Sequence, residues 1–142
     1  MGRIVAIDYG QKRAGIAATD PEQLIAGGLA TIHTKDVLAF LKDYISKENV
    51  ECIVVGKPVD MHNKASDAAR FIEPFVNLLR KHFPDTKIDR ADERFTSQLA
   101  FRTMTEAGLG KKARQNKALI DTISATLILQ SYLELQKNLH KS

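Results

Sequence analysis

An apolar segment near the start of the chain ends in an acidic residue and a glycine, and this combination constrains the fold more than any other feature. Residues 3–7 read Arg-Ile-Val-Ala-Ile, and Asp8 and Gly10 follow. The unbroken apolar run is typical of a central β-strand buried on both faces. Open α/β sheets bind ligands at the carboxyl ends of such strands. We therefore expect Asp8 to mark the functional edge of a sheet; the alternative is a turn residue that hydrogen-bonds its own backbone.

Two cations and a second apolar segment follow the glycine. Lys12 and Arg13 lead into a predicted strand over residues 12–18. Gly10 allows the backbone to turn tightly and allows a large group to approach it. The order of strand, acid, glycine turn, basic pair and strand can hold a metal ion and a phosphate together.

The rest of the chain alternates apolar β-type segments with segments of helical periodicity. The first three strands are joined by short links and can form an antiparallel meander, whereas the later strands are separated by helices and can add in parallel. Thr34 and Thr96 can cap two of the helices. The predicted class is α/β, a mixed five-stranded sheet of three antiparallel and then two parallel strands, with helices on both faces. Expected strands are 3–7, 12–18, 28–33, 51–56 and 88–91, and expected helices begin at 34, at 66 or 67, at 96 and at 117, the last one ending near 139.

Length and charge indicate one basic domain. We predict that the 142 residues form a single domain, 1–142. The formal net charge of +4 and the sequence pI of about 9.2 favour a polyanionic partner. Besides the basic pair after the first strand, cations crowd a glycine-bounded loop that contains Lys111, Lys112, Arg114 and Lys117.

Composition also indicates a cytoplasmic protein with no membrane association. No apolar stretch approaches the length of about 20 residues that a membrane span needs, and no signal-peptide pattern is present. The single cysteine, Cys52, lies in an apolar strand and is expected to pack as a small hydrophobic residue in a reducing compartment. The histidines have polar neighbours, and we expect them at the surface or in turns; they are His33, His62, His82 and His140.

Carboxylates occur at two further places where an acid is costly. Asp92 and Glu93 end the fifth strand, and at most one of them can share a face with Asp8, because adjacent strand residues point to opposite sides. Asp121 lies in the last helix, which is apolar almost all round and is therefore expected to be buried. A buried carboxylate needs a cation, a hydrogen-bond network or a metal ion. Asp121 could instead interact with the helix dipole or pair with a lysine or arginine from elsewhere in the fold.

Together these acids suggest a hard divalent cation. Ligand sets made only of oxygen favour Mg²⁺ or Mn²⁺ over zinc. Two such ions, about 4 Å apart, can activate a water and stabilise the leaving oxygen in phosphodiester hydrolysis. The nearby cations would hold the phosphate backbone of a nucleic acid.

Four segments resemble, in order and at similar spacing, the motifs of the YqgF-type family of Holliday-junction-resolvase-like proteins. The segments are 7–17, 54–58, 92–97 and 121–133. The resemblance implies a ribonuclease H-like fold and a nuclease that matures the 5′ end of the 16S ribosomal RNA precursor during ribosome biogenesis. The older label of the family, Holliday-junction resolvase, implies a branched-DNA substrate.

The resemblance also assigns the catalytic, metal-binding acids to Asp8, Glu93 and Asp121. Three positions depart from the family pattern. Lys57 stands where the family often has an apolar residue, and a glycine-rich turn near 62–64 is missing. Related resolvases carry a further acid one helical turn after the last one, where this chain has Ser124.

Three function classes remain open. The first is a nuclease with Mg²⁺ or Mn²⁺ at the three acids, with Lys12, Arg13 and Arg94 contacting phosphate and Lys111, Lys112 and Arg114 extending the basic surface. The second is a factor that binds nucleic acid or ribosomal particles without catalysis. The third is an actin-like phosphotransferase, whose phosphate loop also begins with Asp-x-Gly, but such enzymes need two domains. Cutting branched DNA symmetrically would require a homodimer, whereas a monomer suffices for trimming RNA.

Overall fold

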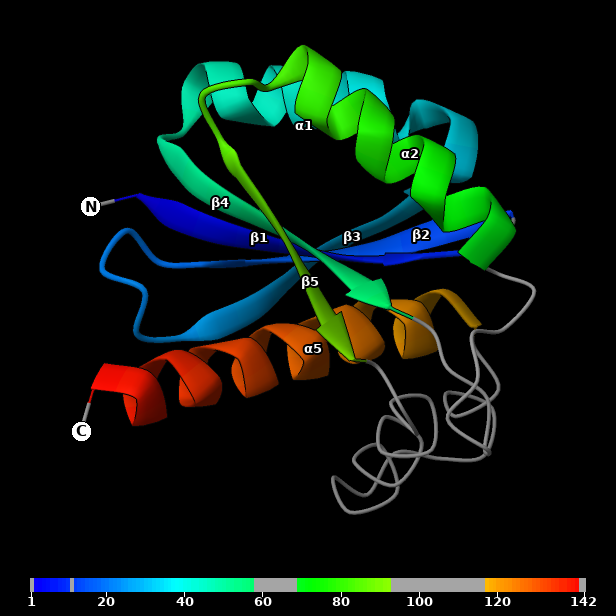
Figure 1. Ribbon diagram of the computed structural model, residues 1–142. Helices are drawn as coiled ribbons and strands as arrows, with labels where there is room; N and C mark the ends of the chain where they lie inside the picture. Colours follow the sequence, from blue (N-terminus) through cyan, green and yellow to red (C-terminus); the bar gives the residue numbers. More distant parts are fainter. Residues whose placement is uncertain (1, 11, 58–68, 93–116, 141–142) are drawn as a thin grey trace.

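The computed structural model describes residues 2–10, 12–57, 69–92 and 117–140, and these form a five-stranded sheet with helices on both sides (Figure 1). The sheet has the strand order β3-β2-β1-β4-β5. Strands β1, β2 and β3 pair antiparallel, and β4 and β5 add in parallel to β1. This confirms the predicted class, and the predicted strand ends agree within two residues. The strands are β1 Arg3–Tyr9, β2 Arg13–Thr19, β3 Ala26–His33, β4 Val50–Lys57 and β5 Lys87–Asp92.

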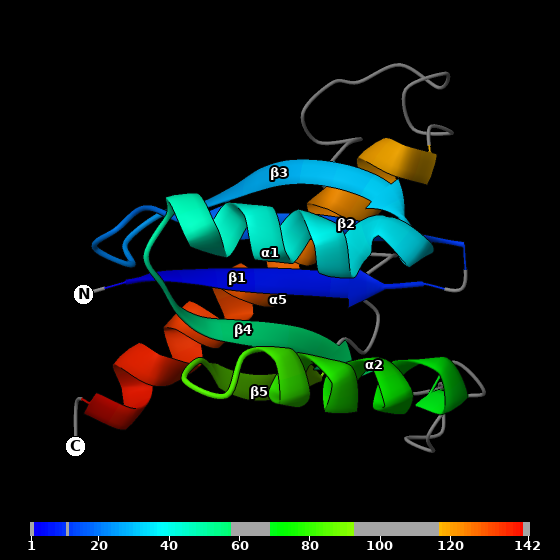
Figure 2. The same cartoon turned by 90° about the horizontal axis from the view of Figure 1, so that it is seen from above.

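Helices cover the two faces of the sheet unequally. Helices α1 (Val37–Lys47) and α2 (Ala69–His82) lie side by side on one face, and α5 (Lys117–His140) crosses the other (Figures 1 and 2). The bounds of α5 confirm the predicted last helix. The predicted helix that begins at Thr96, and the predicted start of α2 at 66 or 67, lie outside the described residues.

The alternation of side chains along β1 builds two separate apolar layers. Val5 and Ile7 are fully buried in the layer under α1 and α2, whereas Ile4 and Ala6 are buried in the layer under α5. The predicted burial of this strand on both faces is confirmed. Because successive strand residues point to opposite sides, Asp8 follows Ile4 and Ala6 and lies on the face that α5 covers.

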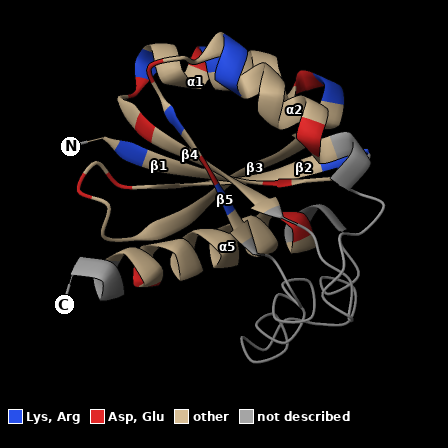
Figure 3. Cartoon of the chain, in the orientation of Figure 1, with Lys and Arg blue, Asp and Glu red and all other residues tan. Residues whose placement is uncertain are grey.

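Helix α5 packs one side on the sheet, and the predicted burial of its apolar segment is confirmed: the described side chains of 120–129 are buried or half-buried. Ala125, Ile128 and Leu129 face the sheet and are buried, while Leu135 is 56% exposed. Figure 3 shows acidic positions near the two ends of α5 and neutral residues between them. None of the described helices is both long enough and apolar enough to span a membrane.

The predicted cap at Thr34 is wrong. A short 3-10 turn (Thr34–Asp36) precedes α1, and the residue before α1, Asp36, makes no side-chain capping bond. The hydroxyl of Thr34 instead donates to the carbonyl of Gly10 at 2.8 Å, and its amide donates to the carbonyl of Lys12 at 3.0 Å. The turn after β1 exposes carbonyl groups that need donors, and Thr34 supplies two, so it fixes the turn that carries Lys12.

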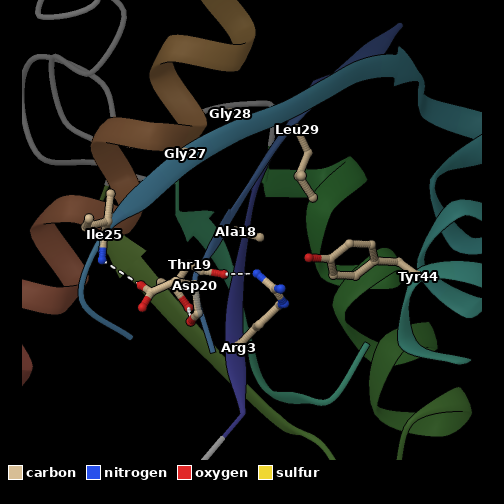
Figure 4. Close-up of a pocket in the computed structure, with 9 residues that line it drawn as sticks. All are labelled: Arg3, Ala18, Thr19, Asp20, Ile25, Gly27, Gly28, Leu29 and Tyr44. Carbon is tan, nitrogen blue, oxygen red and sulfur yellow. Dashed lines mark hydrogen bonds between the residues drawn. The ribbon is translucent and has the colours of Figure 1, made fainter. Parts of the chain in front are cut away.

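A hollow of about 340 Å³ opens between the β2–β3 hairpin and α1, at the end of the sheet opposite Asp8 (Figure 4). Its polar side chains are used by the fold itself. Arg3 bonds the Thr19 carbonyl and Glu48, and Asp20 accepts from the amides at the tip of the hairpin. These amide hydrogen bonds, the Ile25 amide first, hold the pKa of Asp20 below its ordinary value.

Two glycines allow α5 to lie directly against the antiparallel strands. A Cβ atom at Gly15 would lie 2.0 Å from the carbonyl oxygen of Asp121, and one at Gly28 would lie 2.4 Å from the Thr122 side chain. Thr122 also hydrogen-bonds Thr31 of β3 through their hydroxyl groups. The second turn of α5 is therefore seated on the backbone of β2 and β3, and any side chain at Gly15 would push it away.

We predict that Gly15→Ala lowers the free energy of unfolding by about 1–3 kcal/mol, the usual range for overpacking. Gly27→Ala is the matched control, because a Cβ atom there meets nothing within 4 Å. Urea unfolding followed by circular dichroism measures both variants. Equal stability of the two variants would contradict the close approach of α5.

Candidate active site

Asp8 stands near the carboxyl end of β1, half-buried, on the face that α5 covers. In the β1–β2 register it lies opposite Gly15. On the parallel side, Ile7 pairs with Val55, so Asp8 is level with the last residues of β4. This is the edge of the sheet at which the sequence predicted a functional acid.

The close approach at Gly15 brings Asp121 to the same edge. The Asp121 backbone lies over Gly15, and Gly15 is the cross-strand neighbour of Asp8. Since neighbouring strands are about 4.8 Å apart, the backbone of Asp121 lies over the strand next to the one that carries Asp8. The structure thus places two of the three predicted acids, 113 positions apart in the sequence, at one site.

Asp121 is paired with an arginine. The Nε atom of Arg13 lies 2.5 Å from Asp121 Oδ2, and the two side chains are 37% and 24% exposed. Of the roles left open for Asp121, pairing with a cation from elsewhere in the fold is the one observed. Arg13, predicted to contact phosphate, therefore bonds to a carboxylate at the same site.

Ser124 lies one helical turn after Asp121 and is almost completely buried, at 1% exposure. Its hydroxyl oxygen has no hydrogen-bond partner within the part of the chain that the structure describes. An unsatisfied buried hydroxyl is costly, which is why each such group calls for an explanation. Because it follows Asp121 by one helical turn, this hydroxyl adds an oxygen atom without a recorded partner to the same part of α5.

These donors fit a hard divalent cation, although they do not complete a metal site. The carboxylates of Asp8 and Asp121 and the hydroxyl of Ser124 offer oxygen only, the chemistry that Mg²⁺ and Mn²⁺ prefer. Within residues 2–10, 12–57, 69–92 and 117–140, no three His, Cys, Asp or Glu side chains are grouped as metal ligands. The third predicted acid, Glu93, lies outside these ranges.

The other predicted contacts divide between described and undescribed residues. Lys12 is exposed on the turn that follows β1. Asp92 ends β5 in register with Lys57, but its side chain is not among the described ones. The remaining predicted phosphate contacts lie outside the described residues; they are Arg94, Lys111, Lys112 and Arg114.

A further acid on the same face, Asp89 of β5, was missed by the sequence analysis. The Tyr132 hydroxyl on α5 donates to Asp89 Oδ2 at 2.8 Å and lies 3.8 Å from Cys52 Sγ. Burial favours the neutral form of Asp89, but the hydrogen bonds from Tyr132 and from the Arg90 amide outweigh it, so its pKa falls below the ordinary value of 3.8. Burial, with the bond to Asp89, raises the pKa of Tyr132. Asp89 therefore stabilises the contact between β5 and α5. Its position could have been predicted from the alternating side-chain directions along β5 and from the apolar stripe of α5 that covers this face.

Comparison with known proteins identifies the family. Residues 2–135 match the family model described as RuvX, Holliday junction resolvase. The chain belongs to the RuvX family. Its Asp8 edge and the first turns of α5 fall within the matched region, as do all the predicted site residues.

Curated relatives of this RuvX-family protein match it along almost its whole length. A protein of Bacteroides thetaiotaomicron is 58% identical over 137 residues, covering 96% of this chain and 99% of the relative. One from Flavobacterium psychrophilum is 56% identical over 133 residues, covering 94% and 97%. Both carry the name "Putative pre-16S rRNA nuclease".

Solved structures show the same fold at low sequence identity. RuvC of T. thermophilus, in complex with a Holliday junction substrate, superposes with a TM-score of 0.59 at 15% identity, covering 96% of this chain and 97% of RuvC. The Holliday junction resolvase of fowlpox virus gives a TM-score of 0.54 at 16% identity, covering 93% and 98%. The RuvX-family chain thus has the ribonuclease H-like fold that its motifs predicted.

We predict that Tyr132→Phe destabilises the protein at neutral pH by about 1 kcal/mol. The variant loses a hydrogen bond to a charged carboxylate, and the partial exposure of Asp89 weakens that bond. Since the folded-state pKa of Asp89 lies below its unfolded value, this stabilisation is present at neutral pH and is lost as the pH falls below about 4. The difference between variant and parent should therefore shrink toward pH 2–3 in denaturant unfolding.

Tyr44→Phe is the control for this prediction. Among the described residues, the Tyr44 hydroxyl makes no side-chain hydrogen bond, and its pKa is raised mainly by burial, with smaller and opposite effects of the Arg3 and Glu48 charges. Its replacement should give a small difference that does not change over the same pH range. A pH-independent loss in Tyr132→Phe would show that the hydroxyl does not stabilise the charged form of Asp89.

Proposed function

We propose that this protein is a metal-dependent nuclease that hydrolyses phosphodiester bonds in 5′-end processing of the 16S ribosomal RNA precursor. The observation that carries the proposal is the meeting of Asp8 and Asp121 at the carboxyl edge of the sheet, where α5 lies on Gly15. Membership of the RuvX family and the names of relatives more than 50% identical support the reaction and the RNA substrate.

The proposed metal ligands and catalytic residues are Asp8, Glu93 and Asp121, with Mg²⁺ or Mn²⁺ as the cofactor. In β5, Asp89 faces α5 and Arg90 faces α2, where it bonds Glu73. Glu93 has the same sequence parity as Asp89, which favours it over Asp92 as the third acid. When bound, a divalent cation would activate a water and stabilise the leaving oxygen. The protein's own part is to fix the carboxylates on rigid elements.

Basic residues around this edge are proposed to hold the phosphate backbone. Lys12 projects from the turn fixed by Thr34, close in sequence to the acid at the end of β1. Arg13 begins β2 beside it. The proposed contacts also include Arg94, Lys111, Lys112 and Arg114. A cytoplasmic location and contact with ribosomal particles would follow from the proposed substrate.

One observation favours a second candidate function, binding of nucleic acid without catalysis. The pair between Arg13 and Asp121 already neutralises one of the acids without any metal ion. The resolvase description of the family supports a third, cleavage of branched DNA, which would require a homodimer rather than a monomer. A single cleavage experiment separates all three.

We predict that Asp8→Asn lowers cleavage by about a hundredfold or more, the scale on which single catalytic groups contribute. The substrates are a labelled 5′ segment of precursor 16S RNA and a four-way DNA junction, each with Mn²⁺, with Mg²⁺ and with chelator. Asp43→Asn is the control, because it removes the same charge from an exposed acid whose carboxylate pairs with Lys47.

The outcomes separate the candidates. Cleavage of RNA that requires both the metal ion and Asp8 supports the proposed function, and cleavage of the junction alone supports a resolvase. Unchanged cleavage by Asp8→Asn contradicts a catalytic role for Asp8. Retention of RNA in a gel shift, without cleavage of either substrate, supports the binding factor.

Lys12→Ser tests the proposed RNA contact. A lost contact to single-stranded RNA should reduce the slope of log K against log salt concentration by about 0.7. Lys42→Ser is the control, since Lys42 is an exposed lysine of α1, on the opposite face of the sheet. Fluorescence anisotropy at several salt concentrations measures both variants, and identical slopes would place Lys12 away from the RNA.

A further inference from the structure

We propose that Arg13 is an exchangeable counter-ion of this site. Its guanidinium group bonds Asp121; when a divalent cation binds, the guanidinium leaves the carboxylate and becomes available to a substrate phosphate. This inference rests on the proposed function, because it requires a metal ion at Asp8 and Asp121.

The pair is placed so that it can exchange. Arg13 Nε lies 2.5 Å from Asp121 Oδ2, yet the side chains are 37% and 24% exposed, so water and ions reach them. A partly exposed ion pair contributes little net stability. Breaking it therefore costs little enough for a divalent cation to compensate.

Of the two partners, Arg13 is the one that can move. The backbone of Asp121 lies against Gly15, and the neighbouring Thr122 hydrogen-bonds Thr31. A displaced Asp121 would have to lift the second turn of α5 from the sheet. Arg13 holds the carboxylate with the end of a long side chain, whose rotamers can change without moving β2.

Electrostatics gives the exchange its direction. Two carboxylates at one edge repel each other, and a cation between them relieves this repulsion. Arginine, which stays charged at every physiological pH, supplies that charge when no metal ion is present. A divalent ion supplies more positive charge and repels the guanidinium, whose planar donors match a phosphate as well as a carboxylate. The two binding equilibria are linked: the Arg13–Asp121 pair lowers the affinity for the metal ion by the same factor by which the metal ion lowers the stability of the pair.

The exchange can be observed in the unmodified protein. Among the described residues, three arginine Nε groups make hydrogen bonds: Arg13 to Asp121, Arg3 to Glu48, and Arg90 to the Val55 carbonyl. In ¹H–¹⁵N spectra of these Nε–H groups, titration with Mg²⁺ should move the Arg13 signal to the position of a solvent-exposed arginine. The Arg3 and Arg90 signals should stay in place, and Arg13→Gln and Arg13→Lys assign the moving one.

Calorimetric titration with Mn²⁺ provides a second measurement. Arg13→Gln should bind Mn²⁺ about two- to fivefold more tightly than the parent, because the competing ion pair is absent. Arg3→Gln, which removes the same charge from a pair with Glu48 at the far end of β1, should not change the affinity. Asp8→Asn should lose most of the binding.

The results separate failure of this inference from failure of the proposed function. If Asp8→Asn binds Mn²⁺ as the parent does, there is no metal site at this edge and the proposed function fails. If Asp8→Asn loses binding while the Arg13 signal stays in place under Mg²⁺ and Arg13→Gln binds no more tightly, Arg13 is a fixed structural partner and the inference is overturned. Should Arg13→Gln not fold, the Nε titration of the parent protein decides.

Discussion

The candidate site depends on the absence of side chains where α5 touches the sheet. At Gly15 and Gly28 the helix backbone and the Thr122 side chain occupy space that any Cβ atom would fill. Helices usually meet a sheet through a layer of side chains, as α5 does farther along at Ala125 and Leu129. The second turn lies closer, and this brings the Asp121 backbone over β2, next to the strand that carries Asp8. The glycines of β2 and β3 therefore position an acid that neither strand contains.

Placing two carboxylates at one edge creates a charge that the protein must neutralise. Arg13 neutralises part of it from the strand that also carries Gly15, so one short segment of β2 provides both the space for Asp121 and its counter-ion. The pair is only partly buried, which avoids the large desolvation cost of a fully buried pair. Such an edge has a counter-ion from the protein itself and stays accessible to ions from solvent.

Local sequence patterns predicted the elements but not the contacts between them. The apolar run before Asp8 indicated a buried strand, and the order of elements indicated the mixed sheet, because both depend on local periodicity and on connection lengths. The partner of Asp121 is 108 positions away in the sequence, and Thr34 was predicted to cap a helix although it bonds the turn at Gly10. Such contacts depend on which elements meet in space, which no local period encodes. The family motifs predicted Asp8 and Asp121 as site residues, but they gave no indication that Arg13 pairs with one of them.

The position of an acid along the strands of the sheet decides whether it stabilises the fold or is available for chemistry. Asp89 is in register with Val54, and Val54 with Ala6, so it lies one pleat before the level of Asp8. At its level α5 presents Tyr132, whose hydroxyl satisfies the carboxylate. At the level of Asp8 the neighbouring strand has a glycine, and the helix presents another acid with a buried serine one turn later. One face of the sheet thus holds Asp89, whose carboxylate is hydrogen-bonded within the packed layer. Two residues farther toward the carboxyl edge it holds Asp8 and Asp121, whose charge the proposed exchangeable cation, Arg13, balances.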